Sequence, residues 1–263
     1  MTPPSLTEPL RPATKHALEL LLLAMADDEF VIGFTDSEWT GIAPMLEEDV
    51  AMSSLAQDEL GHAQALYRLL AELVEDGRDA DAFAYDRPPE GSYHARLLDH
   101  PRGDWANTIA RRYLYETADD VRLEALSDGG WRPLADLVAK VRREERYHLM
   151  HIAAWLERLA ERSGEPRERL VAALEKLGTD AATVLAPLPR DEVLVRDGIL
   201  AAPFTELDRR WRERLQPVFD RLRLPMPAEL SEPIRARADH SEAFRRLHDE
   251  FNAVRRIDRV ATW

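Results

Sequence analysis

The chain has 263 residues, of which 45% are hydrophobic and 32% charged, and its 35 basic and 49 acidic side chains give a formal net charge of −14. This length allows one large or two small domains with a substantial core, and the acidic balance argues against nucleic acid as a partner because phosphates would be repelled. Since the chain contains no cysteine, disulfides, thiolate metal sites, Cys-ligated iron–sulfur clusters and cysteine nucleophiles are excluded, and any metal must be held by oxygen and nitrogen ligands.

Neither a secretory signal nor a membrane span is evident in the sequence. The stretch Met1–Pro12 lacks the charged segment followed by an apolar segment that a signal peptide requires. The longest apolar stretch, Leu20–Ala26, is much shorter than the roughly 20 residues that cross a bilayer. We therefore expect a cytoplasmic protein with no membrane partner.

Helical periodicity dominates the first part of the chain. Apolar residues recur at spacings of three and four, and Ala, Leu, Glu and Arg fill the positions between them. This pattern predicts a first helix over about Thr14–Phe34 and a second that begins after Pro44 and continues to about Glu75. The segment Gly77–Asp104 holds three prolines, so it cannot be one continuous helix, and we predict a crossover connection there.

Two further long helices follow the crossover. The third is predicted over about Asp104–Leu126, and the fourth opens near Pro133, a favourable residue for a first helical turn, and ends before Gly164. Four helices of about 20–30 residues with one long connection in the middle are typical of a ferritin-like four-helix bundle. The sequence therefore predicts an all-α fold of this class.

Three additional helices are predicted beyond the bundle, over Arg167–Leu185, Pro203–Leu222 and His240–Arg259. We expect a single ferritin-like domain over residues 1–263, with the core bundle at about 14–163 and a helical extension at about 164–263. The last two helices carry apolar residues at helical spacing, and we expect a subunit interface to use part of these stripes. The stripe residues are Phe204, Leu207, Trp211, Leu215, Val218, Phe219, Phe244, Leu247, Phe251 and Val254.

Two Glu-x-x-His motifs carry the chemistry of the sequence. Glu59 and His62 lie in the second predicted helix, and Glu145 and His148 lie in the fourth. Three residues turn a helix by about 300°, so the carboxylate and the imidazole of each motif share one face and can bind one metal ion. Chance alone would produce about one such pair in this composition, so the motifs carry little weight by themselves.

An internal repeat gives the motifs their meaning. Glu29 precedes Glu59 by 30 residues, and Glu116 precedes Glu145 by 29. Antiparallel helices with such spacing bring these residues to the same height in a bundle, so each half of the bundle offers Glu, then Glu-x-x-His. The predicted metal ligands are Glu29, Glu59, His62, Glu116, Glu145 and His148.

This ligand set predicts oxygen chemistry at two metal ions. Four carboxylates neutralise two divalent cations in a low-dielectric core, and carboxylates with imidazoles suit Fe(II) or Mn(II). We expect Glu59 and Glu145 to bridge the ions and Glu29 and Glu116 to be terminal, so that these four carboxylates are the catalytic residues. Asp58 and Glu144 each stand four residues before a motif His, and we expect them to accept a proton from an imidazole.

The residues leave alternatives open. Asp119 or Asp120 could replace Glu116 as a ligand because both lie within one helical turn of it, and His151 is an alternative imidazole. Glu144 or Glu145 could instead pair with neighbouring arginines on a solvated face, and His148 could be a core histidine with satisfied hydrogen bonds.

Several local stretches carry a family resemblance. They are Ala26–Glu29, Ser37–Trp39, Leu46–Asp49, Gly103–Arg111 and Arg146–His151, and the C-terminal segment His240–Arg256 is similar as well. These stretches resemble the PaaC branch of the phenylacetyl-CoA epoxidase family, and the resemblance runs over nearly the whole chain.

The resemblance implies a ferritin-like fold and a multicomponent di-iron monooxygenase. Such an enzyme epoxidises the aromatic ring of an aryl-CoA thioester with O₂ as co-substrate and electrons from a separate reductase. It also implies a homodimer or a heterodimer with a PaaA-type subunit, in which the PaaA branch is catalytic and the PaaC branch is a structural partner with a degenerate metal set.

This chain departs from the PaaC pattern because it keeps His62 and has Glu116, where lost ligands are expected. The first hypothesis is therefore an oxygenase component with its own two iron ions, or manganese in their place. The alternative is a non-catalytic subunit that scaffolds a PaaA-type partner. Neither a cysteine cluster nor a Gly-rich dinucleotide motif is present, so electrons are expected from the separate reductase.

Overall fold

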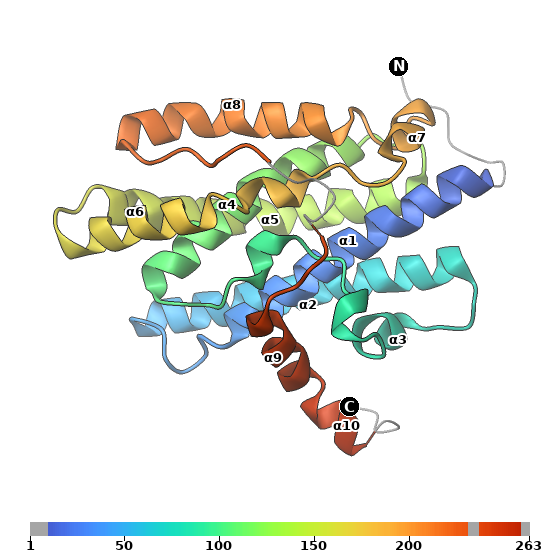
Figure 1. The fold of residues 1–263 in the computed structure, drawn as a ribbon, viewed down its shortest axis with the longest axis horizontal. Helices are drawn as coiled ribbons and strands as arrows, with labels where there is room; N and C mark the ends of the chain where they lie inside the picture. Colours follow the sequence, from blue (N-terminus) through green and yellow to red (C-terminus); the bar gives the residue numbers. More distant parts are fainter. Residues whose placement is uncertain (1–9, 231–236, 259–263) are drawn as a thin grey trace. The chain divides into compact units, whose positions relative to one another are not determined.

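In the computed structural model, residues 10–230 and 237–258 are described, and these residues form helices joined by loops and short turns. They fall into two compact units. The α1–α2 unit comprises the described parts of Leu22–Arg102 and Arg237–Trp263, and the α4–α5 unit comprises those of Met1–Leu21 and Gly103–Ala236. The helical architecture confirms the predicted all-α, ferritin-like class (Figure 1), while the expectation of a single domain stays a prediction.

In the α1–α2 unit, α1 (Pro12–Ser37) packs antiparallel to α2 (Leu46–Val74). The ring of Phe30 lies 6.3 Å from that of Tyr67, whereas Gly33, further along α1, faces Glu59, which comes earlier in α2. Residue numbers therefore rise along α1 as they fall along α2. This register brings Glu29 opposite the turn of α2 that carries the first Glu-x-x-His motif.

Gly33 allows α1 and α2 to approach closely at Glu59. A Cβ atom at Gly33 would lie 2.9 Å from Cβ of Glu59, 3.1 Å from the carbonyl oxygen of Ala56 and 3.1 Å from Cγ of Leu60. Such distances are shorter than ordinary van der Waals contacts, so any larger residue would push the two helices apart. Glycine is thus required for the observed position of the Glu59 backbone relative to α1.

The crossover consists of short elements, as predicted for a proline-rich segment. It contains α3 (Ala80–Tyr85) and the two 3₁₀ turns Pro89–Gly91 and Arg96–Asp99. Asp79 caps α3 by accepting a hydrogen bond from the backbone of Ala82 at 2.8 Å. The crossover therefore leads from α2 to α4 through several short turns.

The C-terminal helix is shorter than predicted. Instead of one helix over His240–Arg259, the structure has α9 (Glu242–Phe251) and α10 (Ala253–Ile257), and residue 259 lies outside the described residues. Ser241 caps α9 by accepting from the backbone of Phe244, which fixes its first residue. The side chain of Asn252 donates to the carbonyl oxygen of His248 at 2.9 Å at the junction where α9 ends.

In the α4–α5 unit, α4 (Trp105–Leu126) and α5 (Arg132–Ala160) are also antiparallel. Trp105 packs edge-to-face on Trp155 at 5.2 Å, and Asp120 lies 3.8 Å from Arg142. In antiparallel helices the numbers of facing residues add to a constant, and in both pairs they add to nearly the same value. The numbers of Glu116 and Glu145 add to that value as well. The structure therefore places Glu116 and Glu145 at the same height along this helix pair.

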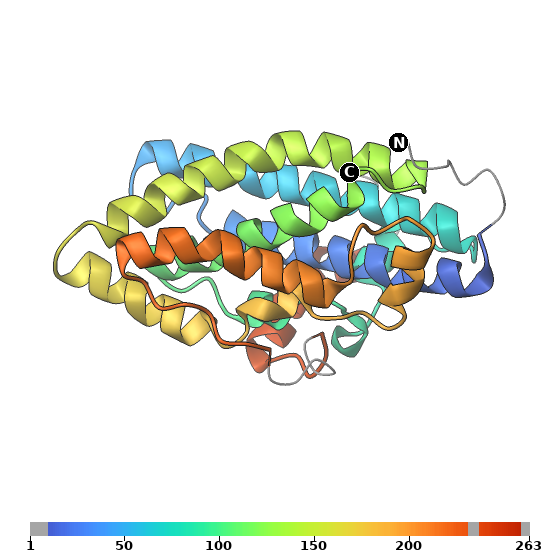
Figure 2. The same cartoon turned by 90° about the horizontal axis from the view of Figure 1, so that it is seen from above.

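Further helices cover α4 within this unit. Both α6 (Glu165–Leu177) and α8 (Phe204–Leu222) contact α4 (Figures 1 and 2). The predicted helix over Arg167–Leu185 is wrong in extent, since α6 ends before Gly178 and a 3₁₀ turn follows over Ala181–Leu185. The backbone of Ala228 donates to the carbonyl oxygen of Gly178 at 3.0 Å, a long-range bond that the local pattern could not reveal. A short helix, α7 (Asp191–Arg196), was not predicted.

The apolar stripes assigned to a subunit interface are largely used inside the chain. The α8 residues Phe204, Leu207, Trp211, Leu215 and Phe219 are at most 1% exposed, and Phe244 and Phe251 of α9 are buried as well. The indole of Trp211 donates to the hydroxyl of Thr117 at 2.9 Å, which attaches α8 to α4. Packing inside the chain therefore accounts for these residues, and the expected interface can draw only on the rest of the stripes, such as Val254, which is 56% exposed. The interface itself stays a prediction.

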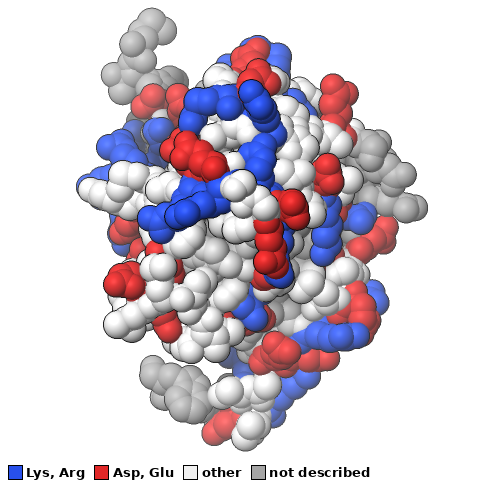
Figure 3. All heavy atoms as spheres, turned by 90° about the vertical axis from the view of Figure 1, so that its left-hand side faces the viewer, with Lys and Arg blue, Asp and Glu red and all other residues white. Residues whose placement is uncertain are grey.

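Charged side chains on the surface are extensively paired. Arg214 contacts Asp120 at 2.8 Å, and Arg169 contacts Asp104 at the same distance. On the face drawn in Figure 3, acidic and basic side chains lie next to one another. Within the part of the chain that the structure describes, every helix is too short or too polar to cross a membrane.

The close approach at Gly33 gives a testable expectation. Gly33→Ala should lower the free energy of unfolding by about 1–3 kcal/mol, because the added Cβ overpacks the α1–α2 contact. Gly61→Ala is the matched control, since a Cβ there meets nothing within 4 Å and alanine favours helix. Thermal unfolding followed by circular dichroism compares the two, and equal melting temperatures would contradict the close approach.

Candidate metal centre

The α1–α2 unit brings together Glu29, Glu59 and His62. One ligand atom from each of the three lies within 4.8 Å of the others. Nδ1 of His62 is 3.5 Å from Oε2 of Glu29 and 3.7 Å from Oε2 of Glu59, and none of the three residues is more than 4% exposed. The i,i+3 spacing on α2 and the antiparallel register with α1 together produce this cluster, which we call the first half-site.

The α4–α5 unit brings together Glu116, Glu145 and His148 in the same manner. One ligand atom from each lies within 4.8 Å of the others, and Nδ1 of His148 is 3.3 Å from Oε1 of Glu145. All three residues are buried. In this second half-site Glu116 also forms an ion pair with Arg112, which is fully buried one turn earlier on α4.

The alternative ligands are placed differently. Asp119 is buried and accepts a hydrogen bond from Nε of Arg122 at 2.7 Å. Asp120 accepts from Arg214 in a partly exposed pair on the surface. His151 is also partly exposed. The structure thus groups Glu116 with Glu145 and His148 and gives both aspartates arginine partners.

Asp58 and Glu144, the expected proton acceptors, are each partly exposed beside a buried glutamate. Their role toward the imidazoles stays a prediction.

The donor set of each half-site fits an iron or manganese ion. Two carboxylates and one imidazole nitrogen are hard and borderline donors that these divalent ions accept, and all of them stand on regular helices. Buried carboxylates are costly unless a cation compensates them, so a bound divalent ion would relieve the charge that each half-site concentrates.

Two residues near these clusters were not singled out from the sequence. Gly33 sets the helix approach at Glu59, and Arg112 binds Glu116. A signal for each was present, since an isolated glycine inside a helical pattern commonly has a packing reason and Arg112 precedes Glu116 by four residues on one helix face.

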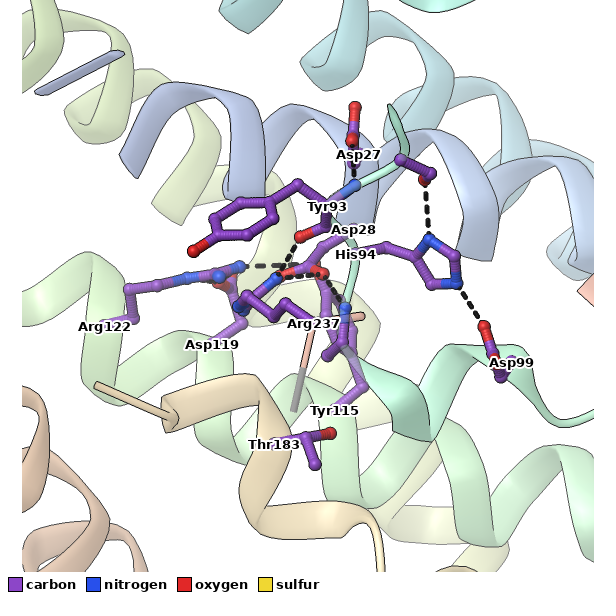
Figure 4. Close-up of polar contacts among 12 residues, drawn as sticks. Asp27, Asp28, Tyr93, His94, Asp99, Tyr115, Asp119, Arg122, Thr183 and Arg237 are labelled. Carbon is purple, nitrogen blue, oxygen red and sulfur yellow. Dashed lines mark hydrogen bonds and ion pairs between the residues drawn. The ribbon is translucent and has the colours of Figure 1, made fainter. Parts of the chain in front are cut away.

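A separate buried cluster in the α1–α2 unit centres on Asp99. Nε2 of His94 lies 2.6 Å and Nδ1 of His240 lies 3.0 Å from the same carboxylate oxygen (Figure 4 shows His94 and Asp99). The two imidazole rings stack with centroids 4.1 Å apart and an angle of 14° between them. Stacked parallel rings direct their nitrogen lone pairs along parallel lines rather than to one point, so this cluster is poorly suited to bind one metal ion with both rings.

The partners of His240 define its protonation. Nδ1 faces the Asp99 carboxylate and Nε2 lies 2.9 Å from the carbonyl oxygen of Ser92, and neither acceptor carries a hydrogen. Both ring nitrogens must therefore donate, which makes His240 an imidazolium. Burial acts to lower the pKa of His240, but the hydrogen bond and charge of Asp99 outweigh it and raise that pKa above its ordinary value.

The pKa values of His94 and Asp99, the other members of the cluster, are lowered. Burial lowers the pKa of His94, so this ring is the neutral member of the stack. Burial alone would raise the pKa of Asp99, yet the hydrogen bonds from His240 and His94 hold the pKa of this carboxyl well below its usual range. One negative and one positive charge thus compensate each other inside the unit.

Arg237 adds a second link between the same segments. Its guanidinium contacts both carboxylate oxygens of Asp28, at 2.9 and 3.0 Å, and donates to the carbonyl oxygen of Tyr93 at 2.9 Å (Figure 4). Arg237 and His240 therefore attach the C-terminal segment to α1 and to the crossover.

The charge of His240 predicts a pH-dependent stability. Because its pKa is raised on folding, its contribution is complete below the unfolded value of about 6.5 and is lost as the pH rises through the folded pKa. The difference in unfolding free energy between wild type and His240→Gln should therefore be larger at pH 6 than at pH 9. Urea unfolding followed by tryptophan fluorescence measures it, and a difference that does not change with pH would refute the imidazolium assignment.

Comparison with known proteins agrees with the family resemblance. The family described as Phenylacetic acid catabolic protein (PaaA_PaaC) matches residues 5–263. The chain is 30% identical over 214 residues to the C subunit of 1,2-phenylacetyl-CoA epoxidase from Escherichia coli (strain K12), with 81% of this chain and 86% of that protein covered. The chain therefore belongs to the PaaA and PaaC family of phenylacetic acid catabolic proteins.

Proposed function

We propose that this protein is a subunit of a phenylacetyl-CoA epoxidase-like multicomponent monooxygenase and that it carries its own dinuclear metal site. One observation carries the proposal: each unit buries the same set of two carboxylates and one imidazole within a few ångströms. A protein with only a scaffolding role has no need to bury these groups twice at corresponding positions of a repeat.

The proposed site joins the two half-sites into one centre. The repeat supports this because corresponding residues occupy the same height in each antiparallel helix pair. Glu29, Glu59, Glu116 and Glu145 would hold the ions together with His62 and His148. When bound, iron or manganese would supply the activation of O₂.

The chain's own residues would hold this centre and keep it dry. Nδ1 of His62 and Nδ1 of His148 face the carboxylates of their half-sites, so these are the nitrogens that would bind the ions. Burial of all six side chains excludes bulk water, which strengthens every electrostatic interaction at the centre.

Substrate, electrons and partners follow from the family. The relative is named as one component of a larger enzyme, so we propose that this chain also works in a complex, as a homodimer or with a PaaA-type subunit. Since the chain has no cysteine, it cannot hold a Cys-ligated iron–sulfur cluster, and a separate reductase would supply electrons. An aryl-CoA thioester would be the substrate.

A non-catalytic scaffold is the second candidate. The relative is the C component of its enzyme, which belongs to the branch implied to be structural, and Arg112 already places a protein cation on Glu116. In this alternative the two units would serve to bind and orient a catalytic PaaA-type partner.

Metal analysis tests the dinuclear site. Protein produced with iron and manganese should contain about two ions per chain, and removal of metal by a chelator should lower the melting temperature because binding is coupled to folding. Glu59→Ala should lower the metal content and raise the melting temperature of the metal-free protein, since one of several repelling carboxylates is removed. Glu47→Ala, an exposed position on the same helix, is the control and should change neither. Two outcomes would contradict the proposal: protein that contains no metal after this production, or a melting temperature that does not change when a chelator is added.

Reconstitution separates the oxygenase from the scaffold. With a PaaA-type partner, a reductase and phenylacetyl-CoA, an oxygenase role predicts that Glu59→Ala lowers turnover by at least about a hundredfold while the complex still forms. A scaffold role predicts unchanged turnover. Light scattering after size-exclusion chromatography verifies the complex, and a chain that stays a 30.0 kDa monomer with the partner present contradicts both roles.

A further inference from the structure

α4 buries three arginines completely, an unusual number for one helix: Arg111, Arg112 and Arg122 are each 0% exposed. Arg112 forms an ion pair with Oε1 of Glu116, and the two side chains are 0% and 1% exposed. A guanidinium keeps its proton at any ordinary pH, so Arg112 is a permanent positive charge in this interior.

We propose that Arg112 is an internal counter-cation that competes with a divalent metal ion for Glu116. It thereby lowers the affinity of the second half-site for its ion. This inference rests on the proposed dinuclear site and concerns how that site is filled.

Charge balance is the first argument. Glu116 and Glu145 together carry two negative charges, which one divalent ion neutralises. Because Arg112 already compensates part of this negative charge at Glu116, an entering divalent ion gains less electrostatic stabilisation there. In the metal-free protein the same guanidinium compensates Glu116 and so favours that state.

Ligand geometry is the second argument. Arg112 takes up part of the acceptor capacity of Oε1 of Glu116, so an ion that enters while the pair persists has the other oxygen, Oε2, as its unobstructed donor. An ion that takes both oxygens must displace the guanidinium from this carboxylate and so break the buried ion pair. Either course costs binding free energy that a neutral residue at position 112 would not cost.

Arg122 provides a matched control on the same helix. It is equally buried, and its guanidinium pairs with Asp119, which lies outside both half-sites. Loss of a buried arginine destabilises the protein at either position. Only loss of Arg112 changes the charge at a proposed metal ligand.

The test uses the metal-free full chain titrated with Mn²⁺, with binding followed by calorimetry and by electron paramagnetic resonance of free Mn²⁺. Arg112→Met should bind the weaker equivalent at least about tenfold more tightly than wild type. Its melting temperature without metal should fall and should rise further on metal addition than that of wild type. Arg112→Gln, which keeps a neutral donor beside Glu116, serves if the first variant does not fold, and it should show the same direction.

The outcomes separate this inference from the proposed function. If wild type binds metal and the Arg112 variants bind it no more tightly, the competition is overturned. Weaker binding in these variants would mean that the guanidinium supports Glu116 as a ligand. An equal gain in Arg122→Met also overturns it, since the effect would then follow from loosening α4. If neither wild type nor any variant binds metal, the dinuclear site itself fails and the inference fails with it.

Discussion

The cost of burying a carboxylate is the constraint on which this structure depends. Each unit is small and helical, yet each encloses several acidic side chains that are almost inaccessible to water. An uncompensated carboxylate in such surroundings would cost several kcal/mol, so each needs a cation or several donors. Asp28 is compensated by Arg237 and Asp27 by Arg87, which tie together segments far apart in the sequence.

The same constraint joins stability to function. In the α1–α2 unit, the ion pairs of Asp27 and Asp28 attach the crossover and the C-terminal segment to α1, and Asp99 of the crossover pairs with His240. In the half-sites the carboxylates cluster with imidazoles, a combination that a divalent ion would compensate best. Part of the acidic excess of the chain thus lies in its interior, and the proposed metal ions would bind to some of these buried carboxylates.

Helix contacts decide how closely ligands can gather. The antiparallel register of α1 with α2, and of α4 with α5, aligns the upstream Glu of each half with its motif. Small residues determine how near the helices come, as at Gly33, and aromatic pairs such as Trp105 with Trp155 fix the longitudinal position. The half-sites therefore stand on rigid elements rather than on loops.

Local pattern alone determined the helical class, most helix boundaries and the repeated ligand motif. Caps and prolines are local signals, so Asp104 before α4 and Pro133 in the first turn of α5 marked the observed starts. The spacing of Glu29 with Glu59 and of Glu116 with Glu145 follows from helix geometry, which is also local. Only the tertiary structure decided the end of α6, the charge of His240 and the closeness of α1 to α2. These depend on partners distant in sequence, Ala228 for Gly178, Asp99 for His240 and Glu59 for Gly33, and local propensity contains no information about such contacts.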